Sequence, residues 1–258
     1  MPEDSLAGAG IARFAPRMNS SNPALRPSTF TEEAVRGDAA PMTVSGAVQK
    51  TTVLLALCVA AASFTWKSGL TGAGTTLTFG GAIAGFIIAM ILCFKHSWAP
   101  VLAPVYAICE GLLLGGVSAV AGARYGGIVV QAVALTFGTL FALLAAYQMG
   151  LIRATPGFKR GVFAATGGIA LFYLISFVLG FFHIQIPFMQ GGTFGIIFSV
   201  VVVIVAALNL VMDFDLIENG ARAGAPKYME WYAAFGLLVT LVWLYLEILR
   251  LLAKTRER

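Results

Sequence analysis

Residues 191–212 read GGTFGIIFSVVVVIVAALNLVM, and none of these 22 residues carries a charge. An α-helix rises about 1.5 Å per residue, so about 20 residues cross the roughly 30 Å hydrocarbon core of a bilayer. A buried β-strand would be far shorter, and a strand of a membrane barrel would alternate apolar and polar residues. The stretch therefore predicts a transmembrane α-helix.

The rest of the chain repeats this pattern. It is 59% hydrophobic and only 11% charged, whereas a soluble domain carries about 25% charged residues. Residues 1–46 contain acids, bases and prolines without an apolar core, which predicts a flexible tail and excludes a signal peptide. We predict an all-α polytopic membrane bundle of seven transmembrane helices within residues 47–258. Its other apolar runs are 47–66, 75–94, 98–123, 126–152, 161–182 and 229–253.

The basic residues indicate the orientation of the bundle. The net charge is +5, but these residues form no continuous stripe, so nucleic acid is not an expected partner. Cytoplasmic loops are rich in Lys and Arg, which predicts a cytoplasmic N-terminus. The C-terminal bases lie on the opposite face of a seven-span protein, so a re-entrant segment is the alternative. The loops on the N-terminal face hold Lys95, Arg153, Lys159, Arg160, Arg222 and Lys227, and the other loops hold Lys67 and Arg124.

Two further patterns concern packing and chemistry. Gly81 and Gly85, like Gly111 and Gly115, form GxxxG motifs, which let two helix backbones approach closely. The sequence contains no HExxH and no GxSxG motif. Cysteines form no CxxC pair and the two histidines are isolated, so we expect neither an enzyme nor a bound cofactor.

Acidic residues within apolar spans are the candidate functional residues, because a carboxylate in the membrane needs a partner or water. Glu110 lies twelve residues into the third span, about 18 Å deep, with Tyr106 one turn earlier. We expect it to be buried and protonated near neutral pH, because a low dielectric penalises the charged form. It is either a structural hydrogen-bonding group or a protonatable residue that lines a path.

Asp213 follows the apolar run 191–212, with Asn209 one turn before it on the same face. Asp215 points elsewhere, and with Glu218 it could simply belong to a solvated helix end. In the last span, Thr240 and Glu247 share a stripe, and Arg250 could pair with Glu247. That pair is either an interfacial ion pair or part of a transport path.

Two segments resemble the Bax-inhibitor family (transmembrane Bax inhibitor motif proteins). They are CEGLLLG at 109–115, in the third span, and MDFDLI at 212–217, at the end of the sixth. The resemblance covers the chain after about residue 45. The long N-terminal tail and the segment GAPKYMEW at 224–231 are similar to the bacterial YccA-like branch.

The resemblance implies a pH-sensitive calcium leak in a bacterial inner membrane. In such proteins a carboxylate pair between the sixth and seventh helices closes the pore, and protonation alters the closure. Asp213 matches the first of these acids and is a candidate calcium ligand, since calcium prefers oxygen. Thr240 stands where the second is expected, and Glu247 is the nearest acid on that face. Asp213 could therefore pair with a base, with Asp215 or with Glu110.

Two other functions fit the same residues. A proton-coupled secondary transporter would also need protonatable groups within the membrane. A regulatory scaffold would bind other membrane proteins and transport nothing. The expected partners are the lipid bilayer, calcium ions and protons, together with membrane proteins in the scaffold case.

Overall fold

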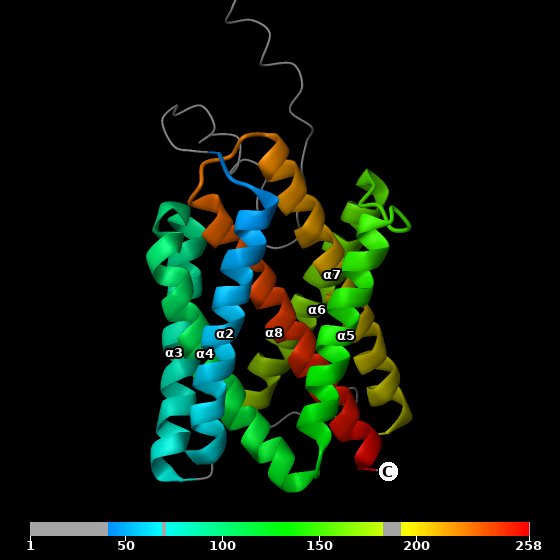
Figure 1. Cartoon of the computed structure of the whole chain (residues 1–258). Coiled ribbons are helices and arrows are strands. Elements are labelled where there is room, and N and C mark those ends of the chain that lie inside the picture. Colours follow the sequence, from blue (N-terminus) through cyan, green and yellow to red (C-terminus); the bar gives the residue numbers. More distant parts are fainter. Residues whose placement is uncertain (1–40, 69–70, 183–191, 258) are drawn as a thin grey trace, which may run out of the picture.

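The computed structural model describes residues 41–68, 71–182 and 192–257, and it contains seven helices that are long and apolar enough to cross a membrane. This confirms the predicted all-α membrane bundle (Figure 1). A short 3₁₀ turn, η2 (His96–Trp98), precedes the third of them. The helices are α2 (Val44–Ser68), α3 (Gly72–Phe94), α4 (Ala99–Arg124), α5 (Ile128–Gln148), α6 (Pro156–Phe181), α7 (Thr193–Arg222) and α8 (Met229–Arg256).

α8 lies at the centre of the bundle. In its most apolar stretch 67% of the residues are buried, against 17% in α3 and in α6. It packs against α2, α4, α5 and α7, whereas α6 packs against α7. Figure 1 shows α8 running obliquely behind α2 and α5. α3 and α6 are consequently the helices most exposed to lipid, and α8 is shielded by its neighbours.

Several predicted helix ends are wrong. α7 continues to Arg222, ten residues beyond the predicted end at 212. α6 begins at Pro156 rather than at 161, since Thr155 caps it by accepting a hydrogen bond from Phe158 N (3.3 Å). Apolar runs mark the part of a helix that lies in lipid, whereas polar first and last turns extend into water with the same backbone geometry.

The segment before α2 is also part of the described fold. α2 begins at Val44, three residues before the predicted start at 47. Met42 is buried, and its backbone N–H donates to Ala225 O (2.7 Å). Thr43 Oγ1 accepts from Gly46 N (3.0 Å), which caps the helix. Residues 41–43 thus join the α7–α8 connection to the start of α2, while residues 1–40 of the predicted tail lie outside the described residues.

The glycine motifs lie where helices pack closely, as predicted. A Cβ atom at Gly81 would lie 2.6 Å from Cys109 O, so α3 and α4 touch through their backbones. A Cβ atom at Gly111 would overlap Cys58 O, and one at Gly115 would overlap Ala62 O, both in α2. α4 therefore packs between α2 and α3 only because these positions lack side chains.

Replacing Gly111 with alanine should destabilise the bundle by about 1–3 kcal/mol, because the new methyl group meets the backbone of α2 rather than a movable side chain. The measurement is reversible unfolding in detergent micelles. Gly138→Ala is the matched control, since a Cβ atom there has nothing within 4 Å. Equal stability of the two variants would contradict the close α2–α4 contact.

Candidate functional site: buried charges between α6, α7 and α8

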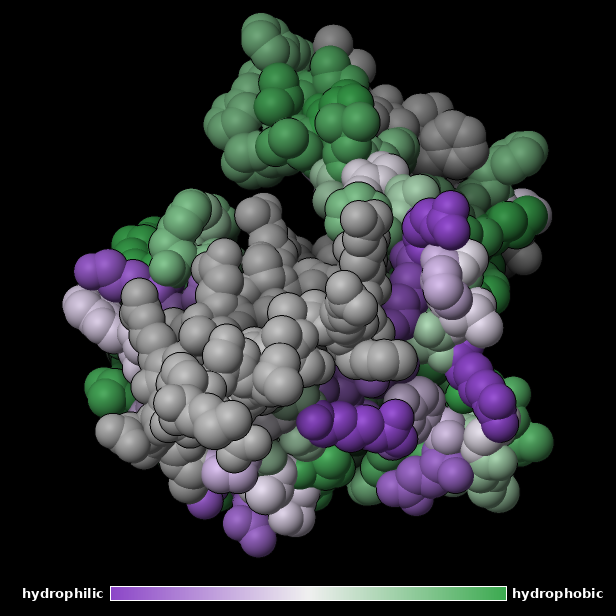
Figure 2. All heavy atoms as spheres, turned by 90° about the horizontal axis from the view of Figure 1, so that it is seen from above, coloured by the Kyte–Doolittle hydropathy of each residue, from purple (hydrophilic) through white to green (hydrophobic). Residues whose placement is uncertain are grey.

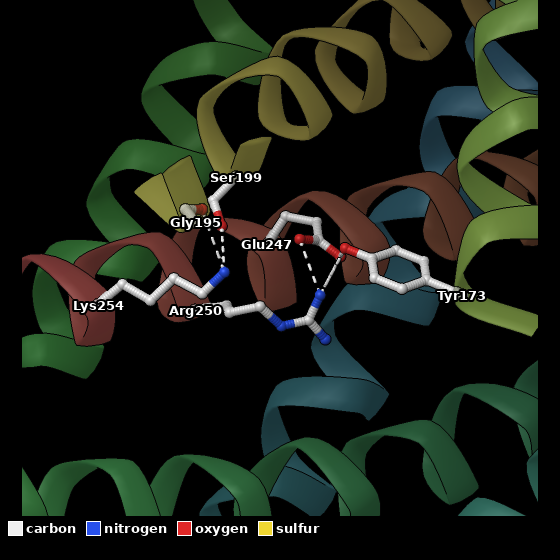
Figure 3. A network of polar contacts seen from close by, with 6 residues as sticks. All are labelled: Tyr173, Gly195, Ser199, Glu247, Arg250 and Lys254. Carbon is white, nitrogen blue, oxygen red and sulfur yellow. Dashed lines mark hydrogen bonds and ion pairs between the residues drawn. The ribbon is translucent and has the colours of Figure 1, made fainter. Parts of the chain in front are cut away.

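Glu247 of α8 is the centre of a polar network at one end of the bundle (Figure 3). Its side chain is buried, and Arg250 Nη1 contacts both carboxylate oxygens at 2.8 and 3.0 Å. The hydroxyl of Tyr173, in α6, donates to Glu247 Oε1 (2.9 Å) and accepts from Arg250 Nη1 (2.6 Å). The predicted Glu247–Arg250 ion pair is therefore confirmed, and it links α8 to α6.

Lys254 extends the network to α7. Its side chain is only 6% exposed, although lysine is almost never buried without partners. Its ammonium donates to Gly195 O (3.1 Å) and Ser199 Oγ (3.0 Å), in the first turns of α7. Figure 3 shows these residues pointing toward one another from the three helices. The end of α8 is thus fixed to the start of α7 and to α6.

Asp213 lies inside the bundle, on α7, and is 1% exposed. Asn209, one turn before it, is 4% exposed and donates to Thr166 Oγ1 of α6 (2.8 Å) and to Val205 O (2.8 Å). Asp213 stands nine residues before the end of α7, about 14 Å by helical rise. The sequence placed it after the apolar run; the structure places it within a continuous helix.

Thr240 lies at a similar depth on the antiparallel helix α8, eleven residues after its start, or about 17 Å. It is 4% exposed, and its hydroxyl donates to Gly236 O in the same helix (3.3 Å). This hydrogen bond satisfies the hydroxyl without a partner from another helix. The position at which the family resemblance implies a second aspartate therefore holds a group that carries no charge.

Asp215 faces away from Asp213, as its two-residue spacing predicts, and Glu218 also has partners of its own. Asp215 forms an ion pair with Lys159 of α6 and accepts from Asn219 Nδ2 (2.9 Å). Glu218 accepts from the hydroxyl of Tyr147 in α5 (2.7 Å) and from Arg222 (2.5 Å). Both acids have partners on neighbouring helices, so the segment is more than a solvated helix end.

Glu110 belongs to another part of the bundle. It is 9% exposed in α4, and a Cβ atom at Gly85 of α3 would lie 3.3 Å from its Oε2. Tyr106, one turn earlier on α4, packs edge-on against Phe235 of α8, with ring centroids 4.8 Å apart. The structure thus places Glu110 at the α3–α4 contact. Asp213 belongs to a different part of the bundle, where Asn209, one turn before it, contacts α6.

A model of the family described as Bax inhibitor 1 like matches residues 22–257. The chain belongs to the Bax inhibitor 1-like family. No curated protein and no solved structure gave a significant match. The residues that carried the sequence resemblance, 109–115 and 212–217, are the helical turns that hold Glu110 and Asp213.

Sequence reasoning missed two buried charged groups of this Bax inhibitor 1-like protein. Lys254 is one, and Glu230, fully buried in the first turn of α8, is the other. Glu230 accepts from Thr43 N and Thr43 Oγ1 (3.0 Å each) and forms an ion pair with Lys50 (3.2 Å). In the sequence both residues resemble ordinary solvent-exposed charges at helix ends, because their partners are far away along the chain.

No group of three or more His, Cys, Asp or Glu side chains that could hold a metal ion occurs among the described residues. Asp213 as a calcium ligand therefore stays a prediction.

Glu247→Gln should lower the stability of the bundle by about 1–3 kcal/mol, because it weakens hydrogen bonds to a charged, buried acceptor. Unfolding in detergent measures this loss. Glu257→Gln is the control, since the Glu257 side chain is 39% exposed and surface changes stay within about 0.5 kcal/mol. If Glu247→Gln were as stable as the control, the network would not hold the three helices together.

Proposed function

We propose that this protein is a pH-sensitive calcium leak whose closed state depends on Asp213. The observation that carries the proposal is a carboxylate with 1% exposure inside the bundle, on α7, nine residues before the end of that helix. α7 packs directly against the most shielded helix, α8. Acids within transmembrane bundles are costly and mark ion or proton paths. Membership of the Bax inhibitor 1-like family supports the same reading.

In this proposal the negative charge of Asp213 holds the pore closed. Asp213 is then ionised in the closed state, and dipoles and charges on the facing helices offset the cost of burying its charge, which favours the packed arrangement of α7 and α8. Protonation removes this charge, so the closing interaction weakens as pH falls through the range in which the group titrates. A carboxylate at this position also attracts calcium, which prefers oxygen ligands.

The resemblance to the family implies two acids that close the pore, but Thr240 stands in the place of the second acid in this chain. Two facing carboxylates share protons and titrate as a coupled pair. Because Thr240 occupies the corresponding depth of α8 and bonds within its own helix, Asp213 closes the pore as a single acid. The pH dependence of the leak should therefore follow a single-site titration rather than a steeper, cooperative one.

Asp213→Asn preserves the shape of the side chain and deletes its charge. Calcium uptake into proteoliposomes should then be as high at alkaline pH as at acidic pH, because the variant resembles the protonated form at every pH. Asp215→Asn is the matched control on the same helix. Its partner is Lys159, so it should retain most of the pH dependence.

The two variants separate the hypotheses. Identical pH profiles for Asp213→Asn and Asp215→Asn would contradict the role of Asp213. Folded protein that passes no calcium under any of these conditions would favour the scaffold. Uptake that requires a proton gradient, and not merely low pH, would favour the proton-coupled transporter.

We further propose that the N-terminus is cytoplasmic and that the membrane is a bacterial inner membrane. Figure 2 shows hydrophilic residues gathered on the end of the bundle where α2 begins, which is the end of the basic loops. The bases of the opposite end are mostly engaged within the protein. Arg250 pairs with Glu247, Lys254 binds Ser199, and Arg256 donates to Gly126 O (2.6 Å). Because these basic residues have partners within the protein, their number near the C-terminus is compatible with a C-terminus outside the cell.

Single cysteines test this orientation. In a variant without Cys58, Cys93 and Cys109, cysteine at Arg36 or at Arg153 should resist a membrane-impermeant maleimide in intact cells and react after permeabilisation, since basic loops resist translocation. Cysteine at Arg124 is the opposite-face control. Labelling of Arg36→Cys or Arg153→Cys from outside would overturn the orientation.

A further inference from the structure

An apolar groove of about 470 Å³ lies on the side of the bundle away from the α6 network. Its walls are α2 and α5 and its floor is α4 and α8; Figure 1 shows α8 between the two walls. Val59 on one wall and Val133 on the other are 55% and 41% exposed, so the groove opens sideways, toward lipid. Its volume is in the range of sites that bind small organic molecules.

The hydroxyl groups that line the groove already have partners within the protein. Ser118 Oγ and the hydroxyl of Tyr245 bond each other at 2.6 Å across α4 and α8. Ser63 Oγ and Thr136 Oγ1 each donate to a backbone oxygen one turn earlier (2.8 Å). No hydroxyl therefore needs water or a polar ligand, and the groove suits an alkyl chain rather than an ion.

The groove has the length of one leaflet. Along α2 its lining extends from Leu55 to Lys67, twelve residues or about 18 Å, whereas half of the hydrocarbon core is about 15 Å thick. Lys67 lies in the last turn of α2, where the helix reaches the membrane surface. In residues 41–68, 71–182 and 192–257, no carboxylate lies within ion-pair distance of it.

We propose that this groove binds one acyl chain of an anionic phospholipid, with the lipid phosphate at Lys67. Burial of methylenes against the apolar walls supplies the affinity, and the interfacial ammonium selects an anionic headgroup. The site is independent of Asp213 and of the proposed leak.

The test uses the full-length protein, purified in mild detergent with phosphatidylglycerol and phosphatidylethanolamine, and native mass spectrometry of bound lipid. The wild type should retain one phosphatidylglycerol molecule. Val133→Trp fills the groove from α5 and should reduce retention about tenfold, since displacing two methylenes is enough for that change. Val130→Trp, on the same helix but 73% exposed and outside the groove, is the matched control.

Lys67→Met should lower the preference for phosphatidylglycerol over phosphatidylethanolamine about fivefold, the contribution of one interfacial lysine, while Lys95→Met at the other face leaves it unchanged. Gel filtration and circular dichroism confirm that each variant folds. Equal retention by Val133→Trp and Val130→Trp would show an adventitious additive only and overturn the site. A second copy of the chain bound instead of lipid, and lost in Val133→Trp, would overturn it in favour of dimerisation.

Discussion

The burial of charged side chains on α8 fixes how this helix packs against its neighbours. A helix in lipid can leave apolar residues exposed, but a carboxylate or ammonium in the same place needs partners. α8 holds Glu230, Glu247 and Lys254 in buried positions, and each is satisfied by a different neighbour. Glu230 binds the start of α2, Glu247 binds α6, and Lys254 binds the start of α7. The central helix therefore dictates where three other elements lie.

These attachments divide the bundle into fixed ends and an intervening region. At the end where α2 begins, Asp215 and Glu218 tie α7 to α6 and α5 through Lys159 and Tyr147. At the opposite end, the Glu247 network and Lys254 tie α8 to α6 and α7. Asp213 lies between the two sets of ties, at the depth of Thr240. In the proposed leak, a change in its charge would act on the part of the α7–α8 contact that these ion pairs do not fix.

The packing of α2, α3 and α4 follows a different principle. There the backbones approach through Gly81, Gly111 and Gly115, and affinity between helices comes from close contact rather than from ion pairs. Glu110 is accommodated at this contact beside Gly85, where a larger residue would meet its carboxylate. The apolar groove also lies on this side of the bundle, between α2 and α5. The polar network lies on the other side, between α6, α7 and α8.

The number of helices and the burial of Glu110 could be predicted from the sequence, because hydropathy and helical spacing are local properties. The Glu247–Arg250 pair was predictable for the same reason, since its members are three residues apart. Tyr173, Lys254 and the Glu230–Thr43 contact could not be predicted. Their partners are separated by 55 to 187 residues, and helix packing alone brings them together. The end of α7 was misplaced because a helix does not stop where its apolar run stops.

The proposed calcium leak can be tested without any variant, because low pH should weaken its closure. The most direct measurement is calcium uptake by proteoliposomes that contain only the purified wild-type protein, compared across pH without a proton gradient. We expect little uptake at alkaline pH and an increase, following a single-site titration, as the pH falls. Uptake that is absent at every pH, or equal at all of them, would contradict it.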